Sequence, residues 1–332
     1  MPAHQPSKRV GESPKSSFGL GMKTKELREV IACLPKGRTL FRYAKDDYAF
    51  RLLGRVAGQF ATLSELRKSR YGKLLEKPSV KNWMANYSSA HWFGPAFGAG
   101  QARQQDYVLA VDEWGDDDST WVWDQTSRRG KSLVLELNLT RRHQMALHRL
   151  LRGAERDDPF YYSGHPGQAG QNATLAWARI DFDLGSGDAL IEEIQSDRIR
   201  DVLGAMGEKP CSSCGRIHYY GYRLDRSRLE RFWAEEMVHH HDIWAEAMLM
   251  AAVDFLFREI GVQRVFYHTF GTGCFLKGIE GKPPPRSLYT QLPKKFCFRE
   301  TDEMPEFLER VRKKKRRLRV LGDKARFFLM ER

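Results

Sequence analysis

The sequence TLAWARIDFDLGSGDALIEEIQ, residues 174–195, decides the fold. Its first half, Thr174–Leu184, is rich in apolar and aromatic residues and predicts a strand. Gly185–Asp188 has the composition of a tight turn, and Ala189–Gln195 returns as a second strand. The stretch therefore predicts an antiparallel hairpin within a sheet.

Elements predicted on either side of the hairpin extend it into a mixed sheet. Ser132–Leu139 alternates apolar and polar residues as a half-buried strand does, and Thr140 can cap a helix that runs through Leu151. After the hairpin, Asp242–Glu259 carries an apolar stripe at helical spacing, and Val262–His268 follows as a strand. Because a strand, a helix and a further strand form a parallel crossover, we expect an α/β fold with a mixed, twisted sheet.

The chain outside these elements differs in composition from one segment to the next. The first residues are rich in Ser, Pro, Gly and basic residues, and Arg312–Arg317 is a block of six cations. We expect a disordered basic tail at 1–25, a mainly helical N-terminal region at 26–130, an α/β domain at 131–300 with an insertion at 198–241, and a basic C-terminal helix at 301–332.

Composition narrows the classes of partner and location. The 332 residues include 55 Lys and Arg against 42 Asp and Glu, a formal net charge of +13, which favours nucleic acid or another polyanion as partner. No run approaches the ~18 apolar residues of a membrane span, and Met1–Lys25 lacks an apolar signal core, so we expect neither membrane insertion nor export. Five cysteines do not suit a disulfide framework, which predicts a reducing, cytoplasmic location.

Polar side chains gather at the end of the second hairpin strand. Since side chains alternate along a strand, Glu193, Gln195 and Asp197 are predicted to share one face, with Glu192 on the other. His268 ends the neighbouring parallel strand, and open α/β sheets bind ligands at this edge. A carboxylate, an amide and an imidazole that meet there can transfer protons. The alternative is that these side chains are exposed to solvent or form structural hydrogen bonds.

A second motif lies in the insertion. Cys211 and Cys214 form a Cys-x-x-Cys pair, whose two thiolates suit tetrahedral zinc. His218 and one of three later histidines, of which we take His239, complete a predicted structural zinc site. Free thiols and a redox-active dithiol are the alternatives.

The order of predicted elements resembles the GNAT acyltransferase fold over roughly residues 130–300. The strand ending in Glu-Ile-Gln-Ser-Asp (193–197), followed by an Ala-rich helix and an aromatic strand, also resembles domains of large polyvalent proteins from phages and mobile elements. The stretch 286–292 followed by Phe296–Phe298 is similar to a late segment of the GNAT family. The resemblance implies N-acyl transfer from acyl-coenzyme A, with Glu193 as general base and Tyr289 as the acid that protonates the thiolate.

The resemblance has one departure. A Gly-rich turn that binds pyrophosphate is expected directly after the strand at Gln195, but Ser196-Asp197-Arg198 stands there. Gly271-Thr272-Gly273 is a second, small turn of a kind that can bind an anion, and we take it as the candidate cofactor-binding segment.

Two further functions remain open. Asp188 and Glu193 resemble the paired acids of a divalent-metal-dependent nuclease, in which the metal activates water. A non-catalytic nucleic-acid-binding module on a degenerate sheet would also fit the charge, the Cys pair and the aromatic stretch 219–223.

Overall fold

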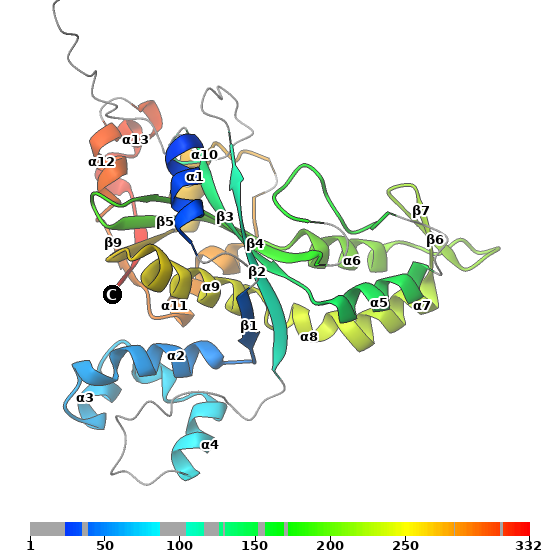
Figure 1. The fold of residues 1–332 in the computed structure, drawn as a ribbon, viewed down its shortest axis with the longest axis horizontal. Helices are drawn as coiled ribbons and strands as arrows, with labels where there is room; N and C mark the ends of the chain where they lie inside the picture. Colours follow the sequence, from blue (N-terminus) through cyan, green and yellow to red (C-terminus); the bar gives the residue numbers. More distant parts are fainter. Residues whose placement is uncertain are drawn as a thin grey trace, which may run out of the picture.

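The computed structural model describes residues 24–34, 39–86, 104–115, 126–128, 130–151, 157–168, 172–281, 283–312 and 315–332. The predicted basic tail therefore lies almost entirely outside the described residues. The described chain has a mixed α/β fold built on one large, mostly antiparallel sheet with helices packed around it (Figure 1). The predicted α/β class is confirmed at this level. In the described residues, no helix has the length and apolar character that crossing a membrane requires.

The sheet is organised around the predicted hairpin. Its eight strands run in the order β1-β2-β3-β4-β5-β8-β10-β9, and every neighbouring pair is antiparallel except β5 with β8. The predicted hairpin and the predicted parallel crossover are both confirmed. The strands are β1 (Thr39–Tyr43), β2 (Gln105–Trp114), β3 (Ser132–Asn138), β4 (Thr174–Asp183), β5 (Asp188–Gln195), β8 (Arg264–His268), β9 (Arg299–Thr301) and β10 (Phe327–Glu331).

The N-terminal region contributes to the sheet as well as to the helices. It contains α1 (Thr24–Cys33), α2 (Asp47–Val56), α3 (Leu63–Lys68) and α4 (Pro78–Asn86), of which the last three lie together in Figure 1. The sequence did not predict strands β1 and β2, which pair with each other, while β2 also pairs with β3. Much of β2 is only half-buried, so its hydrophobic pattern is weak.

A helical layer and a small hairpin separate β5 from the central helix. In chain order they are α6 (Asp197–Gly207), β6 (Arg216–Tyr219), β7 (Tyr222–Asp225), α7 (Arg226–Phe232), a π-helical turn (Trp233–Met237) and α8 (Val238–His241). The central helix that follows is α9 (Trp244–Phe255), and α5 (Arg141–Leu151) lies earlier in the chain, between β3 and β4. Figure 1 places the β6–β7 hairpin at the end of the molecule, beyond α5–α7.

The C-terminal segment does not form the single basic helix that the sequence predicts. After β8 come α10 (Phe270–Lys277), α11 (Gln291–Lys295), α12 (Glu306–Arg312) and α13 (Arg316–Leu321), and the chain then enters β10. Phe327 to Met330 are buried because β10 lies between β8 and β9. Pairing on both sides stabilises this apolar stretch as a strand.

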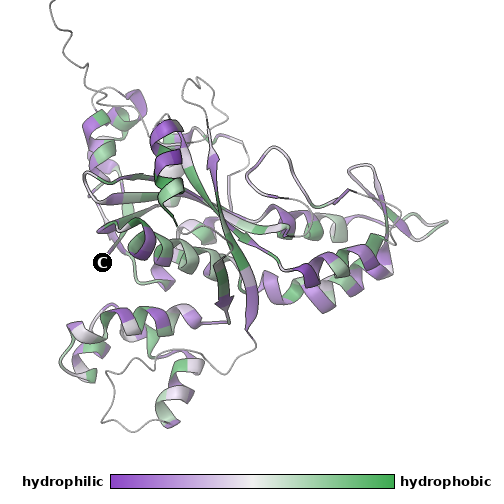
Figure 2. Cartoon of the chain, viewed as in Figure 1, coloured by the Kyte–Doolittle hydropathy of each residue, from purple (hydrophilic) through white to green (hydrophobic). Residues whose placement is uncertain are grey.

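Both faces of the sheet are covered by hydrophobic side chains. Ile191 and Tyr267 belong to the main core, which also holds α9, whereas Leu190 and Phe266 face a smaller core with α12 and α13. Figure 2 accordingly shows the central strands as largely hydrophobic. Any polar side chain on these strands is therefore buried and needs a partner.

Candidate functional site

A β-bulge on β5 sets the geometry of the candidate site. Arg179 of β4 lies opposite Glu193, but the next residue, Ile180, lies opposite Ile191, so Glu192 is an extra residue in the ladder. A bulge interrupts the alternation of side chains. As a result Ile191 and Ile194 both enter the main core. The predicted placement of Glu192 and Glu193 on opposite faces is therefore wrong.

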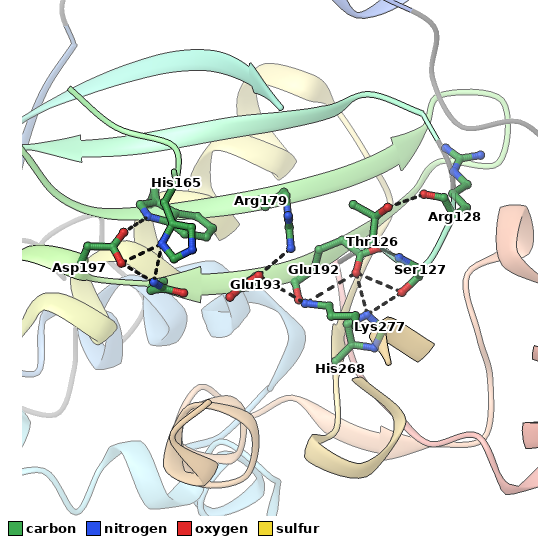
Figure 3. Close-up of polar contacts among 12 residues, drawn as sticks. Thr126, Ser127, Arg128, His165, Arg179, Glu192, Glu193, Asp197, His268 and Lys277 are labelled. Carbon is green, nitrogen blue, oxygen red and sulfur yellow. Dashed lines mark hydrogen bonds and ion pairs between the residues drawn. The ribbon is translucent and has the colours of Figure 1, made fainter. Parts of the chain in front are cut away.

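Glu192 and His268 meet in a buried inner cluster between β5 and β8. The Nε2 atom of His268 lies 3.0 Å from a Glu192 carboxylate oxygen, and both side chains have no exposed surface. The Ser127 backbone N–H and hydroxyl donate to the same carboxylate at 2.8 and 3.0 Å (Figure 3). The sequence predicted that Glu193, Gln195 and Asp197 would lie beside His268, whereas Glu192 is the β5 carboxylate that contacts it.

The charges in this cluster favour a structural role. Burial opposes ionisation of Glu192, but hydrogen bonds and positive charge from His268 and Lys277 outweigh it and hold the Glu192 pKa well below its ordinary value. Burial also lowers the pKa of His268, although the hydrogen bond and the negative charge of Glu192 oppose this effect. Ser127 and Glu192 both contact Nε2 of His268, and its Nδ1 has no partner among the described residues. A Ser–His–acid triad needs the acid on the other nitrogen, so Ser127 is not an activated nucleophile.

Glu193 lies beside this cluster and is held by two cations. Arg179 binds its carboxylate at 2.6 Å, and Lys277 Nζ lies 3.7 Å from it. Lys277 also lies 4.0 Å from Glu192 and donates to that residue's backbone carbonyl, so it bridges both acids. Both cations contact the same carboxylate oxygen, Oε2, so Glu193 is engaged in ion pairs.

Tyr289, to which the resemblance assigns the role of acid, lies near enough to Glu193 for that charge to act on it. Burial, followed by the negative charge of Glu193, raises the Tyr289 pKa well above its ordinary value. Its ring packs 5.5 Å from that of Tyr267, and it is almost completely buried. The phenol therefore stays protonated but has little access to a substrate.

An outer cluster surrounds Asp197 at the carboxyl end of β5. The Nδ1 atom of His165 lies 2.9 Å from one Asp197 oxygen, and Trp177 Nε1 donates to the other at 3.0 Å. Gln195 also donates to Asp197, and Arg200 lies 2.7 Å from it. Burial opposes ionisation, but the hydrogen bonds from His165 and Trp177 and the charge of Arg200 lower the Asp197 pKa. The hydrogen bond from Gln195 to Asp197 joins these two predicted residues in one cluster, in which Figure 3 labels His165 and Asp197.

His165 is the residue that gives this outer cluster a reactive character. Gln195 Nε2 lies 3.0 Å from His165 Nδ1, so an amide N–H group and the Asp197 carboxylate both face this nitrogen. In the tautomer with the proton on Nδ1, the imidazole donates to Asp197. The proton on Nδ1 leaves a lone pair on Nε2. About a third of the side chain is exposed, in contrast to buried His268.

A small hollow adjoins the dyad formed by His165 and Asp197. It is lined by aromatic and polar residues from the loop before β4, from β4 itself and from the start of α6. These are Phe160, Tyr161, Tyr162, Pro166, Gly167, Gln168, Thr174, Leu175, Trp177, Asp197 and Arg198. Tyr161 and Tyr162 are among the large side chains that remain exposed.

Neither the segment after β5 nor the predicted anion-binding turn at 271–273 fits a pyrophosphate. At the start of α6 the Ser196 hydroxyl accepts from Ile199 N–H at 3.2 Å, and the Asp197 carboxylate adds a negative charge. Gly271, Thr272 and Gly273 form the first turn of α10, where Thr269 caps the Thr272 N–H. Gly273 allows close packing, because a Cβ there would lie 3.1 Å from the His268 Cβ. These segments are closed by the chain's own groups, so we derive no step through coenzyme A.

Asp188 is separated from the other predicted acids. It begins β5, is fully buried, and is bound by Arg264 through two contacts of 2.7 and 2.9 Å. Glu193 lies five residues further along the strand, of which one is the bulged residue, so the separation is about 13 Å at the usual rise. Two carboxylates so far apart do not bind one metal ion.

The four predicted zinc ligands are distributed over three elements. Cys211 and Cys214 lie in the turn before β6, His218 is on β6, and His239 is on α8 beside residues of β2 and α5. Within the described ranges no three His, Cys, Asp or Glu side chains are grouped as a metal site. Hydrogen bonds from Ser213 and Cys214 lower the pKa of the exposed Cys211 thiol to about 7. Zinc binding at the cysteine pair stays a prediction.

Comparison with known proteins finds no match. No family model matches the chain, and neither a curated protein nor a solved structure matches it.

Proposed function

We propose that the chain is an enzyme of the N-acyltransferase type in which the dyad of His165 and Asp197 transfers the proton. The observation that carries the proposal is the 2.9 Å contact between His165 Nδ1 and the Asp197 carboxylate at the carboxyl end of β5. A carboxylate that fixes the imidazole in this way orients the opposite nitrogen as a base. Glu193 is the weaker candidate, because Arg179 and Lys277 already neutralise it.

The proposed reaction moves an acyl group from a thioester to an amine. The amine nitrogen attacks the carbonyl carbon, the new C–N bond forms, and His165 Nε2 accepts the proton that the nitrogen loses. The C–S bond then breaks, and the proton returns from His165 to the departing thiolate. Amide and thiol are the products. Since the start of α6 does not suit a pyrophosphate, the proposed donor is a thioester without the nucleotide of coenzyme A.

The order of elements supports a GNAT-like sheet as the scaffold. β3 is followed by α5, by the β4–β5 hairpin, by α9 and by the parallel strand β8, and β9 and β10 complete the sheet. This order agrees with the one that the resemblance implies. The dyad lies at the edge where open α/β sheets place ligands.

The proposed acceptor is an amine carried by a nucleic acid or by a partner bound to one. The net charge of +13 favours a polyanionic partner. Tyr161 and Tyr162, 41% and 50% exposed, lie beside the dyad and offer flat surfaces on which a base can stack.

A transfer assay tests the proposed function. The protein is incubated with the acetyl thioester of N-acetylcysteamine, which has no nucleotide, and with a single-stranded oligonucleotide that carries a primary amine. We expect mass spectrometry to detect the acetylated oligonucleotide, and we expect acetyl-coenzyme A to be no better a donor. Formation of product only at the protein-free rate would overturn the enzymatic proposal, and salt-sensitive binding of the oligonucleotide without turnover would select the non-catalytic module.

A further inference from the structure

The turn that carries Cys211 and Cys214 has the geometry of half a metal site. The Cys211 N–H donates to the Arg216 carbonyl at 2.8 Å, and the Gly215 N–H donates to the Cys211 carbonyl at 2.9 Å, so the turn closes on itself. The Ser213 hydroxyl lies 3.1 Å from the Cys211 sulfur within the same turn. Gly215 has φ +65°, which lets the chain leave the turn toward β6. The turn therefore presents two cysteines at the Cys-x-x-Cys spacing that suits tetrahedral zinc.

The two thiols lack further ligands from their own chain in the part that the structure describes. Cys214 is exposed and Cys211 is partly exposed, and neither forms a disulfide. His218 and His239 do not join them in a group of three metal-binding side chains. Zinc in a structural site takes four ligands, and two thiolates supply half of them.

We propose that Cys211 and Cys214 bind one zinc ion together with the same two cysteines of a second copy of this chain. Four thiolates from two identical pairs give a tetrahedral site with a twofold axis through the metal. The contact is isologous, because each copy presents the same turn to the other. Among the residues that the structure describes, one copy supplies these two thiolates to the site, and the second copy supplies the other two. This inference does not depend on the proposed acyl transfer.

The position of the turn allows such a contact. The β6–β7 hairpin lies at the extremity of the molecule in Figure 1, where a second copy can approach it without meeting the sheet or the helices around α2. Tyr220, at the tip of this hairpin, is 82% exposed, so a second copy could cover a large aromatic surface. Lys209 and Arg216 flank the cysteine pair and are exposed. Their positive charges offset the net negative charge of a zinc ion with four thiolates.

Zinc content and molecular mass test the inference together. The full chain is purified without a histidine tag, under reducing conditions, and loaded with zinc. We expect one zinc ion for every two chains by elemental analysis, and the mass of a dimer by light scattering. A chelator should remove the metal and return the mass to that of a monomer.

Matched cysteine variants complete the test. The double variant Cys211→Ser, Cys214→Ser is expected to stay monomeric with zinc, while Cys33→Ser, which removes an exposed cysteine on α1, should dimerise like the unchanged chain. Because the turn is exposed, we expect the double variant to keep the melting temperature of the metal-free chain. One zinc ion per monomer, no bound zinc, or a dimer that survives both the chelator and the double substitution would each overturn the proposal.

Discussion

Replacing Glu192 by Gln is expected to lower the free energy of unfolding by about 3 kcal/mol at neutral pH. The carboxylate is fully buried and accepts hydrogen bonds from Ser127 and His268, with Lys277 4.0 Å away. Glutamine keeps the shape but removes the charge. Lys277 is then left with less compensation, and the Ser127 N–H with a weaker acceptor.

The loss of stability should depend on pH in a defined direction. The Glu192 pKa is lowered in the folded state, so the carboxylate contributes fully above its ordinary value of 4.5 and progressively less as the pH falls below it. Denaturant unfolding of both proteins at neutral pH and at about pH 4 measures this, with the difference narrowing at the lower pH. Glu230→Gln, at an exposed ion pair, is the control and should change stability by less than about 1 kcal/mol. Equal stability of Glu192→Gln and the unchanged chain at neutral pH would contradict the role given to the inner cluster.

Replacing His165 by Gln is expected to slow acyl transfer by about 10²- to 10⁴-fold, which is the usual contribution of a general base. Glutamine keeps a polar group near Asp197 but has no basic nitrogen, and the side chain is partly exposed, so the fold should persist. Asp197→Asn should cause a loss of the same order because it removes the carboxylate that orients the imidazole. The oligonucleotide assay with the nucleotide-free thioester measures all of these rates.

Two further variants separate the dyad from its competitors. Glu193→Gln should reduce the rate much less than His165→Gln does, since Arg179 and Lys277 already hold that carboxylate. His148→Gln, at an exposed position on α5, is the matched histidine control and should leave the rate unchanged. If Glu193→Gln abolished transfer while His165→Gln did not, Glu193 would be the base and the assignment of His165 would fail.

The sequence predicted the centre of the fold better than its edges. Runs rich in apolar residues on both sides of a Gly-rich turn identified the β4–β5 hairpin, and an apolar stripe identified α9. Strands β1 and β2 were missed because β2 is largely half-buried, and β10 was missed because the basic block before it suggested a helix. β10 forms a strand because it pairs with β8, which lies far from it in the sequence, and with β9, which is very short.

The candidate site was predicted only in part for two physical reasons. Strict alternation placed Glu192 away from Glu193, and a bulge depends on the pairing of two strands, which no single-strand pattern reveals. His165 was not predicted, because its contact with Asp197 joins residues 32 positions apart. Gln195 and His268 were predicted because they end strands, and Asp197 because it follows the end of β5 by two residues.

The tautomer of His165 tests the central claim most directly. A long-range ¹H–¹⁵N NMR spectrum at about pH 8, where an ordinary imidazole is neutral, distinguishes a protonated from a bare ring nitrogen. Comparison with His165→Gln identifies the signal. The account predicts a proton on Nδ1 and a bare Nε2, and it predicts that Asp197→Asn changes this pattern. A proton found on Nε2, or a spectrum unchanged by Asp197→Asn, would contradict it.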